Sequence, residues 1–189
     1  MPSQASNIRE ITMRYDVPLL TQQVSPICYV VAAAMVQKYW QPDFDTTMLT
    51  GGWDPNNSCI PGAKVQGLYT QRLQRAGFQL IDAPTTPFDG PAIDRLLRQF
   101  GPLVFNHFMA NFNYGPARGG KQRPDAAGIH AVVIAGIEGN RSFFNNPWGD
   151  KDVEIPTSDL TASIAQSYAN PYNALFYANA SPLEQNILD

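Results

Sequence analysis

The feature that most constrains the fold is a change of hydrophobic pattern near Gly101. Before this glycine, apolar residues recur at helical spacing. The alanine-rich apolar run over residues 27–40 is too long for a typical strand and predicts a buried helix that starts near Ser25 or Pro26. After it, short β-branched and aromatic runs alternate with turn residues. Helices followed by strands, rather than strands alternating with helices, predict an α+β fold with an antiparallel sheet.

Further elements follow from the same patterns. We expect helices over residues 63–76 and 91–100, and Asp89 or Gly90 should cap the second one. Residues 138–141 have turn composition and predict a β-hairpin between the strands on either side of them. The expected strands cover residues 103–109, 129–137, 142–146, 153–155 and 174–177, with a short helix over 160–166.

Length and composition indicate one globular domain. The chain has 189 residues, of which 44% are hydrophobic, so we expect a single domain over 1–189. Within it, residues 1–16 are expected to be flexible, 17–100 to form a mainly helical half and 101–189 a mainly β half. A net charge of −3 without a basic stripe argues against nucleic-acid binding. No apolar run reaches the roughly 20 residues that span a bilayer, which argues against a membrane partner.

Cysteine and histidine are scarce, which limits the possible catalytic sites. The chain contains Cys28, Cys59, His107 and His130, too widely spaced to form a typical zinc motif, so neither a metal nor another cofactor is expected. The N-terminus lacks a signal peptide, which predicts synthesis in the cytoplasm and reduced thiols. Cys59 lies in a polar loop and is interpreted as a bystander. His107 lies within an expected strand and is more typical of packing or of lining a cleft.

Cys28 occupies a favourable position for a nucleophile. At the start of a helix, the helix dipole favours a thiolate, and free backbone N–H groups can bind an oxyanion. A lone cysteine in an apolar run also fits a small core residue. Gln22, six residues upstream, could donate a second hydrogen bond to an oxyanion. Gln23 is the alternative, and the spacing favours Gln22.

His130 and Asn146 are expected to meet across the predicted hairpin. His130 opens one strand, and Asn146 ends the strand that returns beside it. The Asn146 amide could then accept the imidazole N–H and orient the ring, while Trp148 covers this bond. In a purely structural interpretation, His130 is a core histidine whose hydrogen bonds are all made, and residues 146–149 form a turn in which an aromatic ring fills space. Asn145 is the alternative to Asn146, but neighbouring residues of a strand point to opposite faces.

Together these residues resemble the papain-like cysteine peptidases. The resemblance rests on a Gln six residues before a Cys at a helix start, on the sequence His-Ala-Val in a strand, and on Asn-x-Trp-Gly sixteen residues after the His. Residues 17–36 (VPLLTQQVSPICYVVAAAMV), 101–103 (GPL) and 128–136 (GIHAVVIAG) are most similar to the small bacterial branch, which includes avirulence-type effector proteases and bacteriocin-processing peptidases. This resemblance implies a helical half packed against a β-rich half.

The resemblance also implies roles for individual residues. Cys28 would be the nucleophile, His130 the general base and acid, and Asn146 the orienting residue; Gln22 and the Cys28 N–H would form the oxyanion hole. The Cys28 thiolate would pair with the His130 imidazolium. Two departures stand out: Tyr29 replaces the Trp of larger relatives, and the small branch often has Asp where Asn146 stands.

The implied function is a thiol hydrolase that cleaves peptide or isopeptide bonds through an acyl-enzyme, with a protein or peptide as its substrate. Gly52, Trp53 and Trp148 are the candidate substrate-binding residues, and residues 110–128 a candidate wall of the cleft. The resemblance is compatible with an effector or toxin that is exported without a signal peptide and that meets a host target or a cognate inhibitor or immunity protein. The alternatives are a deamidase, a transglutaminase-like enzyme, a cell-wall amidase or a catalytically silent binding module.

Overall fold

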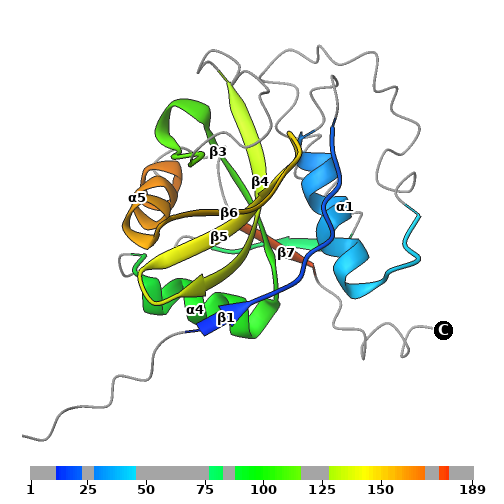
Figure 1. Cartoon of the computed structure of the whole chain (residues 1–189), viewed down its shortest axis with the longest axis horizontal. Coiled ribbons are helices and arrows are strands. Elements are labelled where there is room, and N and C mark those ends of the chain that lie inside the picture. Colours follow the sequence, from blue (N-terminus) through cyan, green and yellow to red (C-terminus); the bar gives the residue numbers. More distant parts are fainter. Residues whose placement is uncertain are drawn as a thin grey trace, which may run out of the picture.

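An antiparallel sheet with helices on both faces forms the centre of the protein (Figure 1). The structure is a computed structural model and describes residues 12–22, 28–45, 77–82, 88–115, 128–168 and 175–178. The strands are β1 (Thr12–Arg14), β2 (Phe78–Leu80), β3 (Leu103–Phe108), β4 (Ile129–Glu138), β5 (Arg141–Asn146), β6 (Asp150–Pro156) and β7 (Leu175–Ala178). The helices are α1 (Cys28–Trp40), α4 (Gly90–Phe100), α5 (Thr157–Tyr168) and the short 3-10 helix η1 (Met109–Asn111). The sheet order is β2-β7-β3-β4-β5-β6, with β1 also paired to β4.

Strand β4 lies in the middle of the sheet and is buried on both faces. Ala131, Val133 and Ala135 belong to the core that α1 covers, whereas Val132 and Ile134 belong to the core beneath α4 and α5. Successive side chains of a strand point to opposite faces, so a strand covered on both sides needs a continuous apolar run. This requirement explains the sequence of β4 and makes it the platform for both halves of the fold.

Helix α1 is apolar on nearly all sides because it is enclosed by the rest of the molecule. Residues 30–37 are all buried, and the helix packs against β3 and β4. Cys28 is its first residue, so the N-terminus of the helix is where the thiol lies. The expected start at Ser25 or Pro26 lies outside the described residues.

Helix α4 begins and ends as its sequence predicts. The Asp89 carboxylate accepts a hydrogen bond from the backbone N–H of Ala92 at 2.8 Å, which is a typical N-cap. At the other end, the N–H of Gly101 donates to the carbonyl of Leu97 at 2.8 Å, with φ of 74° at the glycine. A Cβ at Gly101 would lie only 2.3 Å from the Trp40 ring, so this position requires glycine.

Strand β1 was not predicted from the sequence, and it pairs with the part of β4 that extends beyond the first residue of β3. The register places Arg14 opposite Gly136, and the N–H of Tyr15 donates to the Ala135 carbonyl at 2.8 Å. A Cβ on Gly136 would lie 2.5 Å from the Met13 carbonyl oxygen and 2.8 Å from the Arg14 Cα. Glycine at this position therefore lets the N-terminal strand approach β4, and the chain then continues toward Gln22.

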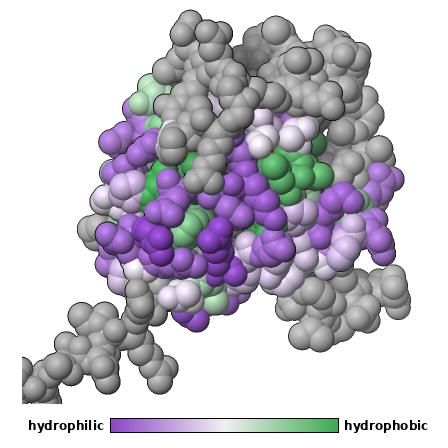
Figure 2. Space-filling view, viewed as in Figure 1, coloured by the Kyte–Doolittle hydropathy of each residue, from purple (hydrophilic) through white to green (hydrophobic). Residues whose placement is uncertain are grey.

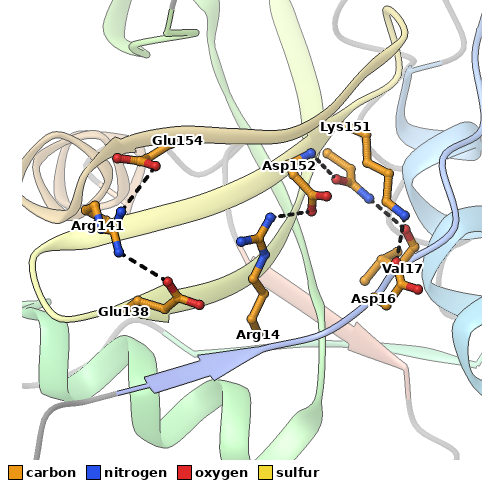
Figure 3. A network of polar contacts seen from close by, with 9 residues as sticks. Arg14, Asp16, Val17, Glu138, Arg141, Lys151, Asp152 and Glu154 are labelled. Carbon is orange, nitrogen blue, oxygen red and sulfur yellow. Dashed lines mark hydrogen bonds and ion pairs between the residues drawn. The ribbon is translucent and has the colours of Figure 1, made fainter.

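Charged side chains further connect the N-terminal segment to β6 (Figure 3). Arg14 pairs with Asp152 at 3.3 Å, and Lys151 pairs with Asp16 at 2.6 Å. The coloured part of the face drawn in Figure 2 is mostly hydrophilic, with several apolar patches within it. Arg14 and Asp152 are partly exposed and Asp16 is 90% exposed, so water screens both pairs and they add little to stability. They set the position of the segment more than they stabilise the fold.

Most of the remaining helices and strands are of the type that the sequence predicts. The predicted hairpin is confirmed, with Glu138 opposite Arg141 across its turn. Strand β6 and helix α5 are longer than expected, and β2, like β1, is a three-residue strand without a sequence signal. The helix expected over 63–76 lies outside the described residues. Among the residues that the structure does describe, no helix is both long and apolar enough to cross a membrane.

Candidate active site

The structure brings His130 and Asn146 into direct contact. His130 is the second residue of β4, and Asn146 is the last residue of β5, the strand paired beside it. The imidazole Nε2 lies 2.9 Å from the Asn146 Oδ1, and both side chains are buried. The hairpin thus produces the contact that the sixteen-residue spacing predicts.

Two further hydrogen bonds determine which end of the Asn146 amide faces the imidazole. Oδ1 also accepts the backbone N–H of Trp148 at 3.1 Å, and Nδ2 donates to the Asp150 carboxylate at 3.3 Å. A flipped amide would place its NH2 group against the Trp148 N–H and its oxygen against the Asp150 carboxylate. Oδ1 therefore faces His130 and accepts from Nε2–H. A neutral imidazole has one N–H, so its Nδ1 carries the free lone pair.

Aromatic rings enclose His130. Trp148 stacks on it with ring centroids 4.1 Å apart and an interplanar angle of 21°. Tyr114 lies 5.0 Å from the Trp148 ring and 5.9 Å from His130. Trp148 lies within the turn that is closed by a hydrogen bond of 2.9 Å from the Gly149 N–H to the Asn146 carbonyl. Because water is kept from the His130–Asn146 bond, that bond is stronger than an exposed one.

His107 packs behind the site, as one of its two sequence interpretations predicts. It is fully buried and lies opposite His130 in the β3–β4 register. Its Nδ1–H donates to the Phe105 carbonyl at 3.3 Å, so its Nε2 accepts from the Tyr114 hydroxyl at 2.8 Å. Burial, and then the neighbouring His130, lower the pKa of His107 well below its usual value. The ring is therefore neutral at pH 7 and supports the wall behind His130.

Cys28 is a free, partly buried thiol directly beside this wall. The backbone of Ala131, the residue that follows His130, lies near enough to the sulfur to lower the pKa of the thiol, and so does the backbone of Tyr29 and of Cys28 itself. The N-terminus of α1 is thereby joined to the start of β4. The thiol at the start of α1 and the backbone beside His130 at the start of β4, which come from the two halves of the fold, are thus brought close together.

Burial favours the neutral form of both groups. It raises the pKa of the Cys28 thiol to about 11, although the three backbone N–H groups partly oppose the shift. It lowers the pKa of His130 to about 4, although the hydrogen bond to Asn146 partly opposes this shift as well. The ion pair expected from the sequence is thus not the state that burial favours here. A neutral imidazole with a free Nδ1 is instead suited to act as a general base.

Gln22 is attached to the turn that carries Asn146. Its backbone N–H donates to the Pro147 carbonyl at 2.8 Å, and Thr21 lies beside Gly149. The side-chain Oε1 is buried and has no hydrogen-bond partner among the described residues. The segment leading to Cys28 is thus connected to the β half close to His130.

Asn145, the alternative to Asn146, has a structural role. Its Nδ2 donates to the Val17 carbonyl at 2.9 Å, and its Oδ1 accepts the Asp152 N–H at 2.8 Å. It points away from His130 and attaches the N-terminal segment to β6. Asp150 and Tyr114 contact the site but were not singled out in the sequence. Gly52, Trp53, Gln23 and Cys59 lie outside the described residues.

Comparison with known proteins identifies the family and the fold of the chain. The model of the Peptidase_C39 like family matches residues 14–177. A structure from Bacillus anthracis, described as a C39-like peptidase, superposes with a TM-score of 0.57 at 17% identity, over 90% of this chain and 98% of that chain. A chain from a structural study of the mite allergens Blo t 1 and Der p 1 superposes with a TM-score of 0.54 at 16% identity, over 89% of this chain and 70% of that one. No curated protein sequence gives a significant match. The expected papain-like α+β fold is confirmed.

Proposed function

The chain belongs to the Peptidase C39-like family, and from this premise we propose that it is a cysteine hydrolase that cleaves peptide or isopeptide bonds through an acyl-enzyme on Cys28. The observation that carries the proposal is the buried His130–Asn146 hydrogen bond of 2.9 Å beside the Cys28 thiol. A nucleophile, a base and a residue that orients the base are the groups that acyl transfer requires. The substrate is then a peptide or a protein.

In the first half of the reaction, His130 acts as a general base. Its Nδ1 takes the thiol proton as the sulfur of Cys28 forms a bond to the substrate carbonyl carbon. The oxyanion that develops on the carbonyl oxygen accepts hydrogen bonds from the Cys28 N–H at the start of α1 and from the Gln22 amide. The imidazolium then gives its proton to the leaving amine as the carbon–nitrogen bond breaks.

In the second half, a water molecule replaces the amine. His130 takes a proton from this water, the resulting hydroxide attacks the thioester, and the carbon–sulfur bond breaks. The proton then returns to the sulfur of Cys28, which restores the resting enzyme. Throughout both halves, Asn146 holds the ring by its Nε2–H, so that Nδ1 remains directed at the reacting atoms.

The proposal is tested by product profiling. Purified wild-type protein and a Cys28→Ala variant are each incubated with a complex proteome and with peptidoglycan, and the products are identified by mass spectrometry. New peptide termini in the wild-type sample alone support a peptidase. Deamidated side chains or cut peptidoglycan bridges would assign the same residues to a deamidase or a cell-wall amidase. Identical products from both proteins would refute the enzyme proposal.

A further inference from the structure

Behind Asn146 lies a carboxylate that the reaction described above does not use. Asp150 is the first residue of β6 and lies directly opposite Asn146 in the β5–β6 register. The tight turn between them, over residues 147–149, brings the Asp150 Oδ2 to 3.3 Å from the Asn146 Nδ2. Polar contacts therefore run without interruption from Asp150 through Asn146 to His130.

The contacts of Asn146 indicate that this carboxylate determines the orientation of the amide. An asparagine amide can present either its oxygen or its nitrogen to a neighbour, and only the oxygen can accept the imidazole N–H. The Trp148 N–H selects the oxygen at one end, and the Asp150 carboxylate selects the nitrogen at the other. Because the Asn146 side chain is 1% exposed, water does not readily replace either partner.

The carboxylate also supplies a negative charge. When His130 takes a proton from Cys28, a cation forms within a wall of Trp148, Tyr114 and the neutral His107. A hydrogen bond to a carboxylate polarises the Asn146 amide, so that its oxygen becomes a better acceptor for the imidazolium N–H. Asp150 itself is only partly buried, so solvent screens a share of this effect.

We propose that Asp150 is a positioning residue for the hydrolase reaction, because it orients the Asn146 amide and stabilises, through that amide, the imidazolium formed on His130. The inference rests on the proposed function for its catalytic consequence. The predicted effect of Asp150 on the His130 ring depends only on the two hydrogen bonds, from His130 to Asn146 and from Asn146 to Asp150.

The test compares Asp150→Asn with Asp152→Asn. Both replacements remove one carboxylate from β6, but the Asp152 side chain pairs with the exposed Arg14, and its left-handed φ of 55° is one that asparagine tolerates. The first readout, NMR titration of the His130 ring, needs no substrate. We expect Asp150→Asn to lower the pKa of His130 by about half a unit, since a stabilising charge is lost, and Asp152→Asn to leave it unchanged.

The second readout is turnover of a cleaved substrate. Asp150→Asn should lower kcat by up to about tenfold, because a charged acceptor is replaced by a weaker neutral one, with KM nearly unchanged. Asp150→Glu, which keeps the charge, should recover most of both effects. If Asp150→Asn does not fold, Asp150→Ser provides a second neutral variant. Equal titrations and equal kcat for the Asp150 and Asp152 variants would overturn the inference.

The two proposals can fail separately. If Cys28→Ala keeps wild-type activity, the hydrolase proposal fails, while the titration of His130 still decides whether Asp150 acts on that ring. If Cys28→Ala is inactive but the Asp150 variants behave as the Asp152 control does, only the inference about Asp150 fails.

Discussion

The burial of His130 predicts that the protein loses stability in mild acid. Its pKa in the folded protein is about 4, below the usual histidine value of 6.5 that applies to the unfolded chain. The unfolded state therefore binds a proton first as the pH falls. Stability is fully present above about pH 6.5 and decreases as the pH falls from there toward about 4.

The size of this loss follows from the two pKa values. At about pH 4.5 the unfolded histidine is almost entirely protonated, whereas the folded one is still mostly neutral. Linkage between protonation and folding then lowers the free energy of unfolding by about 2.5 kcal/mol relative to pH 7. This is a large share of the roughly 5–15 kcal/mol that stabilises a typical domain.

The assay is urea unfolding followed by tryptophan fluorescence at pH 7 and pH 4.5, on wild type and on His130→Gln. Glutamine does not titrate, and the carboxylates contribute to both proteins, so their effects cancel in the comparison. We expect wild type to lose about 2–3 kcal/mol more than the variant between the two pH values. Equal losses would refute the conclusion that His130 is buried in its neutral form.

Three further predictions follow from individual contacts. Asn146→Ala should lower kcat/KM about 10- to 100-fold, because the imidazolium of His130 loses a hydrogen bond. Steady-state kinetics that match wild type would contradict this prediction. Gly136→Val should lower the free energy of unfolding by about 2–4 kcal/mol, because the valine side chain would collide with β1. Gly90→Ala is the control, since its Cβ would make only ordinary contacts, and thermal melts should show little loss of stability for it. The rate at which iodoacetamide alkylates Cys28 should rise from about pH 7 toward about pH 11, since burial raises the pKa of the thiol to about 11. A rate that does not change between about pH 5 and 8 would instead indicate a thiolate–imidazolium ion pair.

Much of the site could be predicted because its residues lie on elements with strong local signals. The β-branched run of β4, the turn after Glu138 and the aromatic return strand predict a hairpin, and a hairpin determines which residues face each other. His130 and Asn146 were therefore placed together correctly. Asp89 likewise marks the start of α4 through its capping preference.

The rest depends on tertiary contacts that leave little trace in the sequence. Strands β1 and β2 are three residues each, too short for a periodic pattern, and β1 forms only because Gly136 lets the backbone approach. The ionisation of Cys28 and His130 depends on how completely the two halves bury them, and a position at a helix start does not reveal this. Asp150 reaches Asn146 only through the geometry of the intervening turn.

The central claim, that Cys28 is a nucleophile activated by His130, is tested most directly by labelling with a peptide library that carries an acyloxymethyl ketone. Peptide mapping by mass spectrometry locates the adduct in wild type and in His130→Ala. We expect the adduct on Cys28 and not on Cys59, at a rate that falls at least about 100-fold in His130→Ala, the usual size of a general-base contribution. Equal labelling of both cysteines, or a rate that does not depend on His130, would contradict the account.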